Sequence, residues 1–541
     1  MASVHNDNEE QKESSTDAPR LEPVTWYREP HLRKLYFSCF FLLIGSATTG
    51  FDGMLQNTSQ QMDAWKAFFP EYLDAHKLGV LINIYNIGSI TSFFASPYMA
   101  DVLGRKPTII VGCVIMIAGA CVTSLSNGYS MYLGGRYVVG FGNSLVQVCS
   151  PMLLTELCHP QHRGPLTTVY NCLWNLGALL VSVIGWGTAS VGNDWSWRSI
   201  TLLQALPSIV QLIGIWWLSE SPRFLVSKGR SRQALAVLAK HHGGGDANHP
   251  TVRFEFREIK EAVEMERKAD KTSTYLDFFR TKGNRWRLAI VVSLGIISQY
   301  SGNALFSNYI DVVYEGAGIR EQNKKLALTA GRTMMDLFVS ITAALSVDKV
   351  GRRPLFLVAI SGMVVAFGCW TVVGAVYENS AVQTPGGGGD GVSYTNQAAG
   401  FAQIAFVWLF AIFYDIGFSG LLVAYALEVL PFHLRAKGMV VMNIVVQAVL
   451  AIGNQTNKLA WNSLPRHWNF MLFYTLWNTC ELVFVYFFYV ETKGHTLEDI
   501  ARIFDGEDDA APAVDDAEQA NKETRLSSNH SSSNSPGVLS S

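Results

Sequence analysis

The sequence predicts an all-α integral membrane protein whose transmembrane helices form two halves of six. Its 541 residues are 49% hydrophobic and only 16% charged, whereas soluble domains carry about 25% charged residues. The apolar residues gather in stretches of roughly 20, each long enough to cross a hydrocarbon core of about 30 Å. Related motifs also occur in the same order in the first and second parts of the chain. These observations predict a polytopic membrane protein with an internal repeat.

Twelve apolar segments follow one another along the chain. A soluble helical protein would present a polar face on each helix, and these segments mostly do not. We therefore expect membrane-spanning helices at about 36–55, 78–100, 107–126, 130–156, 164–191, 198–218, 286–314, 326–347, 355–377, 399–429, 438–460 and 469–490.

The loops between these segments predict the orientation and organisation of the chain. Lysine and arginine concentrate in the loops 101–107, 159–164, 348–354 and 432–438, and short basic loops face the cytoplasm. Both termini then lie in the cytoplasm. The expected parts are a disordered N-terminus (1–34), a six-helix half (35–218), a cytoplasmic linker with amphipathic helices (219–284), a second half (285–504) and a disordered acidic, serine-rich tail (505–541).

Composition argues against several other classes of function. A net charge of −2 provides no basic surface for nucleic acid. The first 30 residues contain no apolar h-region, so no cleaved signal peptide is expected. The loops contain no nucleophile–base pair, metal cluster or phosphate loop, so neither an enzyme, a metal nor a cofactor is expected. The cysteines form no CxxC pair and instead read as small buried residues: Cys39, Cys113, Cys121, Cys149, Cys158, Cys172, Cys369 and Cys480.

Three motifs repeat in order between the two halves. The loop DVLGRKP returns as DKVGRRP, and Glu156 and Glu428 each precede an arginine by seven residues. The element SESPRFLVSKGR after the sixth span corresponds to VETKGHTLEDI after the twelfth. Two six-helix repeats in the same orientation, with a cleft between them, are typical of transporters.

These motifs resemble those of the sugar porters of the major facilitator superfamily, over about residues 35–505. The paired G-R-[KR] loops are present, and the P-E-S-P-R and P-E-T-K-G elements are present without their leading proline. The stretches GFDGMLQN, SQYSGNALFSNY and EVLPFHLRAKG resemble the fungal group of lactose permeases, cellodextrin transporters and some hexose transporters. The resemblance implies the superfamily fold and a sugar transporter that works as a monomer in the plasma membrane.

Charges repeated at the cytoplasmic helix ends predict a gate. Ion pairs there would close the cytoplasmic side in the outward-open state and break when it opens; ordinary interfacial salt bridges, each worth little, are the alternative. The expected pairs are Asp101–Arg105, Glu156–Arg163, Asp348–Arg352 and Glu428–Arg435, with Glu220, Arg223 and Glu491 alongside them.

Amide and hydroxyl side chains within the spans predict a sugar site. Amides both donate and accept, which suits sugar hydroxyls, and within a bilayer they need a wet cavity or a neighbouring helix. The resemblance places sugar-binding amides at Asn171 and Gln299 and an aromatic site near Tyr425. Further candidates are Ser301, Asn303, Tyr309, Asn443 and Gln447, with Trp174 and Asn175 nearby in the fifth span.

Three charged residues depart from the family pattern. Asp336 stands where sugar porters usually carry an asparagine in the eighth span, and Arg332 lies one turn earlier. The two can form an intrahelical pair, or Asp336 can accept hydrogen bonds from two sugar hydroxyls. Asp415 adds an acid to the tenth span without an obvious partner. These residues argue against a standard neutral hexose as the substrate.

Asp52 is a lone carboxylate in the first apolar segment, and Arg136 is a lone cation in the fourth. A charge near the middle of a membrane helix costs roughly 3 kcal/mol, so Asp52 is expected to have a function. The resemblance places the two spans side by side, and its proton-coupled members pair an Asp and an Arg there. A pair that forms in one state and parts in another would take up and release a proton. A permanent structural pair in a facilitator is the alternative.

The sequence thus predicts a sugar:proton symporter that imports a lactose- or cellobiose-like disaccharide or a hexose by alternating access. A passive facilitator and, less favoured because the tail is short, a sugar-sensing receptor on the same fold are the alternatives. The expected partners are the sugar, the proton and the lipid bilayer. A sequon at Asn57, on the predicted outer loop, also predicts a glycan close to the membrane.

Overall fold

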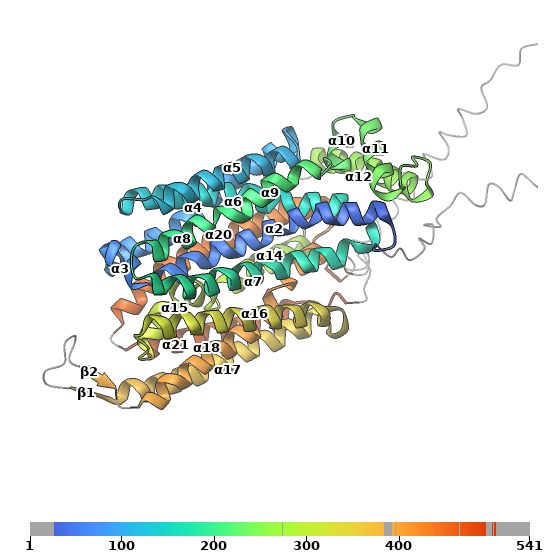
Figure 1. Ribbon diagram of the computed structural model, residues 1–541. Coiled ribbons are helices and arrows are strands. Elements are labelled where there is room, and N and C mark those ends of the chain that lie inside the picture. Colours follow the sequence, from blue (N-terminus) through green and yellow to red (C-terminus); the bar gives the residue numbers. More distant parts are fainter. Residues whose placement is uncertain are drawn as a thin grey trace, which may run out of the picture.

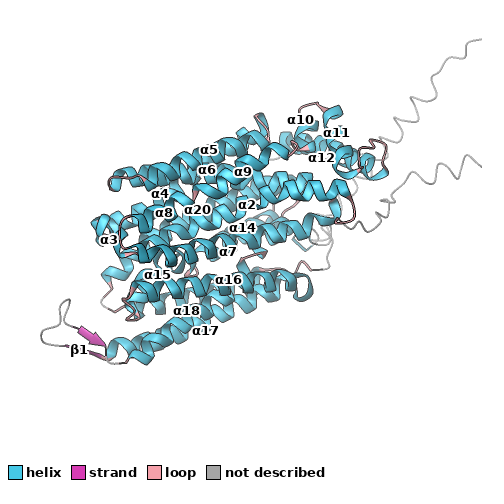
Figure 2. Cartoon of the chain, viewed as in Figure 1, coloured by secondary structure: helices cyan, strands magenta, loops and turns pink. Residues whose placement is uncertain are grey.

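The computed structural model describes residues 26–272, 274–383, 392–394, 396–464, 466–493, 500 and 503–504. These residues form a bundle of long helices that run roughly parallel to one axis (Figure 1). Helix makes up nearly all of the described regular structure, and one short hairpin is added (Figure 2). The predicted disordered segments 1–34 and 505–541 lie, apart from residues 26–34, outside the described residues.

The first half begins with the 31-residue helix α2, which extends five residues beyond the predicted end of the first span. Short helices follow it at the end of the bundle. The elements are α2 (Pro30–Gln60), α3 (Asp63–Phe68), η1 (Pro70–Leu73), α4 (Ala75–Val102), α5 (Arg105–Ser124), α6 (Tyr129–Leu157), η2 (Pro160–His162), α7 (Arg163–Thr188), η3 (Ala189–Val191), α8 (Trp195–Leu203), α9 (Ala205–Gly214) and η4 (Ile215–Trp217).

Four helices form the linker, and the second half follows. The amphipathic helices predicted in the linker are α11 and α12. The elements are α10 (Pro222–Ser227), α11 (Ser231–His242), α12 (Pro250–Thr272), α13 (Asp277–Arg280), α14 (Lys282–Tyr300), α15 (Asn303–Gly316), α16 (Gln322–Val350), α17 (Arg352–Asn379), β1 (Ala381–Gln383), β2 (Val392–Tyr394), α18 (Gln397–Phe418), α19 (Leu421–Val429), α20 (Phe432–Ser463) and α21 (Trp468–Phe488). Strands β1 and β2 pair antiparallel.

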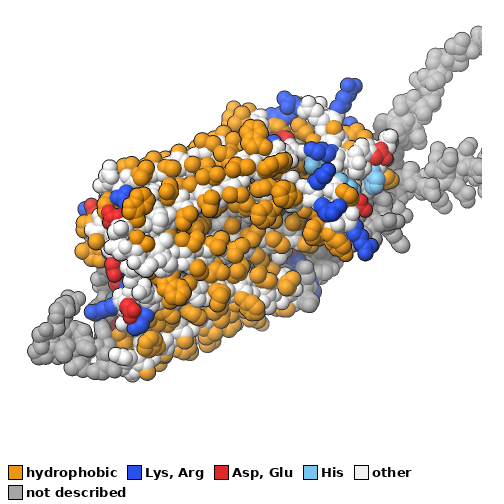
Figure 3. All heavy atoms as spheres, viewed as in Figure 1, with side chains coloured by type: hydrophobic (Ala, Val, Ile, Leu, Met, Phe, Trp, Pro, Cys, Tyr) orange, Lys and Arg blue, Asp and Glu red, His pale blue; other side chains and the backbone are white. Residues whose placement is uncertain are grey.

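Eleven of the described helical segments are long and apolar enough to cross a membrane. The predicted eighth span is α16, which has 29 residues but is less apolar because it carries charges such as Arg332 and Asp336. At 1.5 Å per residue it is long enough to cross a core of about 30 Å, and it packs against α7 and α18. Figure 3 shows apolar side chains covering the middle of the visible face and charged ones at its two ends.

The two ends of the bundle differ. One end, which we call the linker face, carries α10, α11 and α12; the other, which we call the far face, carries α3 and the β1–β2 hairpin (Figure 1). The seventh span is broken between α14 and α15 at Gly302, whose φ of 111° is in the region that favours glycine. This break divides the span into a linker-face part and a far-face part.

The helices that carry Asp52 and Arg136 each pack closely against a neighbouring helix through a glycine on both sides of the contact. A Cβ atom at Gly50 would lie 1.8 Å from the Trp174 carbonyl oxygen, and one at Gly177 would lie 1.9 Å from that of Ala47. Helices α2 and α7 can therefore approach this closely only because both positions lack a side chain. Helices α4 and α6 pack in the same way, through Gly88 and Gly140.

Candidate functional site

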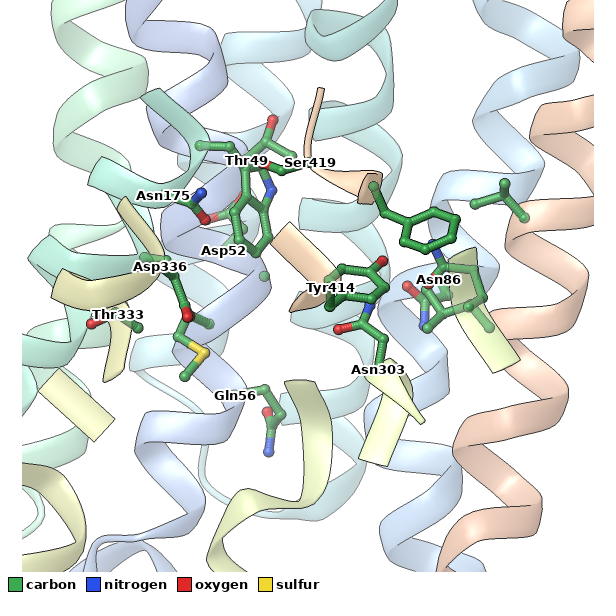
Figure 4. Close-up of a pocket in the computed structure, with 18 of the residues that line it drawn as sticks. Thr49, Asp52, Gln56, Asn86, Asn175, Asn303, Thr333, Asp336, Tyr414 and Ser419 are labelled. Carbon is green, nitrogen blue, oxygen red and sulfur yellow. The ribbon is translucent and has the colours of Figure 1, made fainter. Parts of the chain in front are cut away.

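A cavity of about 380 Å³ lies between the two halves, within the range of small-molecule sites. Helices α2, α4, α6 and α7 line it from the first half, and α14, α15, α16, α18 and α20 from the second. Figure 4 shows side chains of both halves around this space. The predicted residues that line it are Asp52, Arg136, Asn171, Gln299, Asn303, Asp336 and Gln447, together with Trp174, Asn175, Arg332 and Asp415.

Asp52 lines the cavity close to Arg136 and to the side chain of Gln204. Its side chain is fully buried, and neither carboxylate oxygen has a hydrogen-bond partner among the described residues. Arg136 lines the same cavity and is 2% exposed, yet the described residues contain no ion pair between it and Asp52. The predicted pair is therefore near but not formed in this conformation.

A hydrogen-bonded chain positions the tyrosine ring that lies against Arg136. The Thr49 hydroxyl donates to Asn143 Oδ1 at 3.0 Å, and Asn143 Nδ2 donates to the Tyr85 hydroxyl at 2.6 Å. The Arg136 guanidinium then lies over the Tyr85 ring, 5.0 Å from its centroid. An aromatic face attracts a cation, so Tyr85 offers Arg136 an alternative to a carboxylate partner.

The second half presents a different set of charges to the cavity. Arg332 Nε lies 3.5 Å from Asp336 Oδ2, as the i,i+4 spacing predicts. The other oxygen, Asp336 Oδ1, and Asp415 Oδ2 are buried without a hydrogen-bond partner among the described residues. The two carboxyl groups are close enough to interact electrostatically. This part of the cavity thus holds two acids and one arginine.

Aromatic side chains give the cavity an apolar wall. Phe410, Tyr414 and Phe418 lie one turn apart on α18, and their rings stack in sequence at 6.0 and 5.3 Å between centroids. The Tyr414 hydroxyl donates to the Ser298 carbonyl oxygen at 2.7 Å. Trp174 lines the cavity from α7. Amides beside aromatic faces can bind the hydroxyl edge and the apolar face of a sugar ring.

Four predicted binding residues do not join this group. The Ser301 carbonyl accepts from Asn478 at 3.1 Å at the α14–α15 break. The Tyr425 hydroxyl donates to the Val490 carbonyl at 2.8 Å, beyond the end of α21. Ser301, Tyr425 and Asn443 are absent from the cavity lining, and the side chain of Tyr309 lies outside the described part of the chain.

Several cavity residues carry no strong sequence signal. They are the polar residues Thr49, Gln56, Tyr85, Asn86, Ser89, Gln147, Thr333, Tyr414 and Ser419. Tyr414 alone had a usable pattern, because Phe410, Tyr414 and Phe418 recur at helical spacing. The others are single polar residues in apolar helices, which equally indicate helix–helix hydrogen bonds.

The predicted gating charges of the first half form a helix cap and a different set of pairs. Glu220 accepts from the backbone N–H groups of Arg105 and Lys106, each at 3.2 Å. Arg105 lies 3.4 Å from Asp101, as expected, and also 3.4 Å from Glu156. Glu156 was expected to pair with Arg163, whose Nε has no partner among the described residues. Arg105 reaches Glu156 instead because it starts α5 beside the end of α6.

The second half repeats this arrangement. Glu491 accepts from the backbone N–H groups of Arg352 at 3.0 Å and Arg353 at 3.2 Å. Arg352 also lies 3.1 Å from Glu428, which was expected to pair with Arg435. The Nε of Arg435 has no partner among the described residues, and the side chain of Asp348 lies outside them. Both arginine–glutamate pairs join helices of the same half. The remaining predicted gating residue, Arg223, lies in α10 and also has an interaction partner.

The sequon residue Asn57 lies within α2 rather than in a loop. Its side chain is fully buried, and its amide faces the Met54 sulfur at 3.6 Å. A glycan acceptor must be accessible, so this conformation does not favour glycosylation at Asn57.

The sequence matches known proteins over most of its length. Residues 38–504 match the family described as "Sugar (and other) transporter". A high-affinity glucose transporter of Kluyveromyces lactis is 26% identical over 492 residues, covering 89% of this chain and 87% of that protein. The probable polyol transporter 6 of Arabidopsis thaliana is 26% identical, covering 80% of this chain and 87% of its own. The hexose transporter HXT9 of Saccharomyces cerevisiae is 24% identical, covering 79% and 74%.

Solved structures of the E. coli xylose transporter XylE share the fold. Its partially occluded inward open form matches with a TM-score of 0.69 at 19% identity, covering 86% of this chain and 100% of that one. The proton:xylose symporter XylE bound to 6-bromo-6-deoxy-D-glucose matches with a TM-score of 0.68 at 20% identity, covering 87% and 99%. The helical bundle of two halves is thus common to these chains.

Proposed function

Because the chain belongs to the Sugar (and other) transporter family, and so is a multi-pass sugar transporter of the major facilitator fold rather than an enzyme, we propose that it imports sugar together with a proton by alternating access. We also propose that it belongs to the group of lactose permeases, cellodextrin transporters and some hexose transporters. It would lie in the plasma membrane with its linker face and both termini in the cytoplasm, and it would work as a monomer.

One observation carries the proton coupling: Asp52 faces the cavity fully buried, with both oxygens unpaired among the described residues. Such a carboxylate is costly in its ionised form. Arg136 is close by but turned to Tyr85. If Arg136 moves to Asp52 in another conformation, the ionised form becomes favourable there and the proton leaves. Alternation between these two arrangements would couple proton movement to the transport cycle.

The substrate class follows from the cavity lining. The amides of Asn171, Gln299, Asn303 and Gln447 and the ring of Tyr414 surround the space, and they suit a neutral, hydroxyl-rich ligand. Relatives are described as glucose, hexose and polyol transporters. We propose a hexose or a disaccharide, bound between Trp174 on one side and the α18 aromatic residues on the other.

Uptake by a transporter-deficient yeast tests the proposal. A panel of radiolabelled hexoses, pentoses, lactose and cellobiose is offered to cells that express the full chain, with and without a protonophore. We expect concentrative uptake of at least one of these sugars, and we expect the protonophore to abolish accumulation. Uptake that only equilibrates and ignores the protonophore would instead identify a facilitator.

A further inference from the structure

Four charged side chains form a ring at the far face. Lys66 Nζ lies 2.8 Å from Asp311 and 2.9 Å from Glu315, and Lys325 Nζ lies 2.9 Å from Asp311 and 2.6 Å from Glu315. Each amine therefore contacts both carboxylates, and the signs alternate around the ring. We call these four residues the far-face ring.

The ring joins the two halves through a single residue. Lys66 belongs to α3 in the first half, whereas Asp311 and Glu315 lie on α15 and Lys325 begins α16 in the second. The contacts of Lys325 stay within the second half. Of the contacts within the ring, those of Lys66 are the two that must break when the halves separate at this face.

Burial makes these contacts stronger than ordinary surface pairs. The side chains of Lys325, Asp311 and Lys66 are 2%, 7% and 14% exposed, whereas that of Glu315 is 46% exposed. The two contacts of Asp311 are therefore withdrawn from water and screened less than those of Glu315. Burial alone would lower the pKa of Lys66, but the Asp311 and Glu315 carboxylates outweigh it and raise this pKa above its usual range. Lys66 therefore stays charged, and its positive charge stabilises the carboxylates of Asp311 and Glu315.

Neutral contacts between the halves surround the ring. The Asp63 backbone N–H donates to Gln322 Oε1 at 2.6 Å, and Gln322 Nε2 donates to the Ala189 carbonyl at 3.4 Å. One turn deeper, the Thr329 hydroxyl donates to Gln61 Oε1 at 3.0 Å. Helix α16 thus reaches α3, the end of α2 and the segment after α7 at the same face.

We propose that the far-face ring is the outer gate of the transport cycle, with Lys66 as the latch that holds this face closed while the cavity serves the linker face. This inference rests on alternating access as proposed above. When the face opens, the second half keeps Asp311, Glu315 and Lys325 together with a net charge of −1. That residual charge attracts Lys66 back and favours reclosure.

Neutralising the latch tests the gate. In Lys66→Gln, the outward-open state gains population, and the apparent affinity for external sugar rises by the same factor. We expect the KM for external sugar to fall about fivefold or more, the scale of losing a partly buried charge-assisted contact. In the purified full chain, amide hydrogen exchange within α3 and α15 should rise by a similar factor.

Lys324→Gln is the matched control. Lys324 lies beside Lys325 on α16, is 68% exposed and pairs only with Glu321 of its own half among the described residues. Its loss should change neither KM nor amide exchange in α3. The proposal fails if Lys66→Gln and Lys324→Gln behave alike in a chain that transports sugar. A wild-type chain that transports no sugar would overturn the transport proposal, while amide exchange would still report the latch.

A charge exchange separates gating from misfolding. Lys66→Glu places a third carboxylate beside Asp311 and Glu315 and should open the face further than Lys66→Gln. Adding Glu315→Lys restores opposite charges across the halves and should return amide exchange in α3 toward the wild-type rate. If the double variant exchanges as fast as Lys66→Glu alone, the ring contacts do not hold the face, and the latch is refuted.

Discussion

The two halves of the chain are alike at the linker face and different in the cavity. In both, a glutamate after the last span accepts from the first N–H groups of a helix that follows a glycine with φ near 110°. In both, an arginine of that helix pairs with a glutamate of the same half. In the cavity, Asp52 and Arg136 come from different helices and are unpaired with one another, whereas Arg332 and Asp336 are paired within one helix.

This difference indicates which charges can switch. A pair on two helices changes its separation when those helices move, whereas an i,i+4 pair moves as a unit. Helices α2 and α6 pack directly against each other, so we expect a small shift between them to bring Arg136 to Asp52. The repeat therefore preserves the scaffold, and our proposal places the proton coupling in the first half.

The largest expected effect is on Arg136. Arg136→Gln leaves Asp52 without a cation that can approach it, and we expect concentrative sugar uptake to fall by about 100-fold, the scale of removing one partner of a buried charge pair. Arg136→Lys should retain part of the activity because the charge is kept. Initial rates of sugar uptake under an imposed proton gradient measure both. An Arg136→Gln variant that still accumulates sugar would contradict the proposal that proton coupling lies in the first half.

A double-mutant cycle on Arg332 and Asp336 tests the second half. If the pair is structural, Asp336→Asn or Arg332→Gln alone removes one partner of a buried ion pair and lowers transport by about tenfold, while the double variant recovers most of it. The measurement is the uptake rate together with the thermal unfolding midpoint of each variant. Absence of recovery in the double variant would assign Asp336 to sugar binding instead.

The aromatic walls provide a smaller effect on binding. Tyr414→Leu removes the middle ring of the α18 stack, and Trp174→Leu removes the ring on the opposite half. Ring contacts of this kind contribute about 0.5–1.5 kcal/mol, so we expect KM to rise several-fold with the maximum rate little changed. Competition for uptake by unlabelled sugar measures both variants. A fall in maximum rate with unchanged KM would place these rings in the conformational change rather than in binding.

The smallest effect concerns the two capping glutamates, which differ in pH response. Burial raises the pKa of Glu220, so its contribution to stability is present below the usual glutamate pKa and is lost as pH rises. For Glu491, burial also raises the pKa, but backbone N–H groups outweigh it and lower the value. Its contribution is present above the usual pKa and is lost as pH falls.

Unfolding midpoints across the acidic to neutral range test this contrast. At neutral pH, Glu491→Gln should cost about 0.5 kcal/mol of stability through the lost interaction with the α17 N-terminus, and Glu220→Gln should cost less. Equal losses of stability in both variants, with the same dependence on pH, would contradict the opposite pKa shifts of these two glutamates.

Much of the fold could be predicted because the bilayer imposes it. Segment length, basic loops and the repeated motifs were sufficient for the two-half helical architecture, with α16 hidden in part by its own charges. The break at Gly302 and the extension of α2 to Gln60 depend on tertiary contacts that hydropathy does not record. The location of Asn57 inside a helix follows from that extension.

The site could be predicted only where a charge or a family motif marked it. Asp52, Arg136 and Asp336 are conspicuous in apolar helices, and they line the cavity. Tyr85 and Thr49 are ordinary polar residues whose role depends on which helices meet. The partners of Glu156 and Glu428 depend on the positions of the α5 and α17 starts. The far-face ring joins residues about 250 positions apart. The charges of the loops alone do not indicate which of these residues pair.

Proton movement measured together with sugar movement tests the central claim most directly. The purified full chain and its Asp52→Asn variant are reconstituted in liposomes that contain a pH-sensitive dye, and a sugar gradient is imposed without a pH gradient. We predict that the wild type acidifies the compartment that sugar enters. The variant should exchange labelled sugar without any pH change. Equal proton movement in the two proteins, or sugar-driven transport without proton movement in the wild type, would contradict coupling through Asp52.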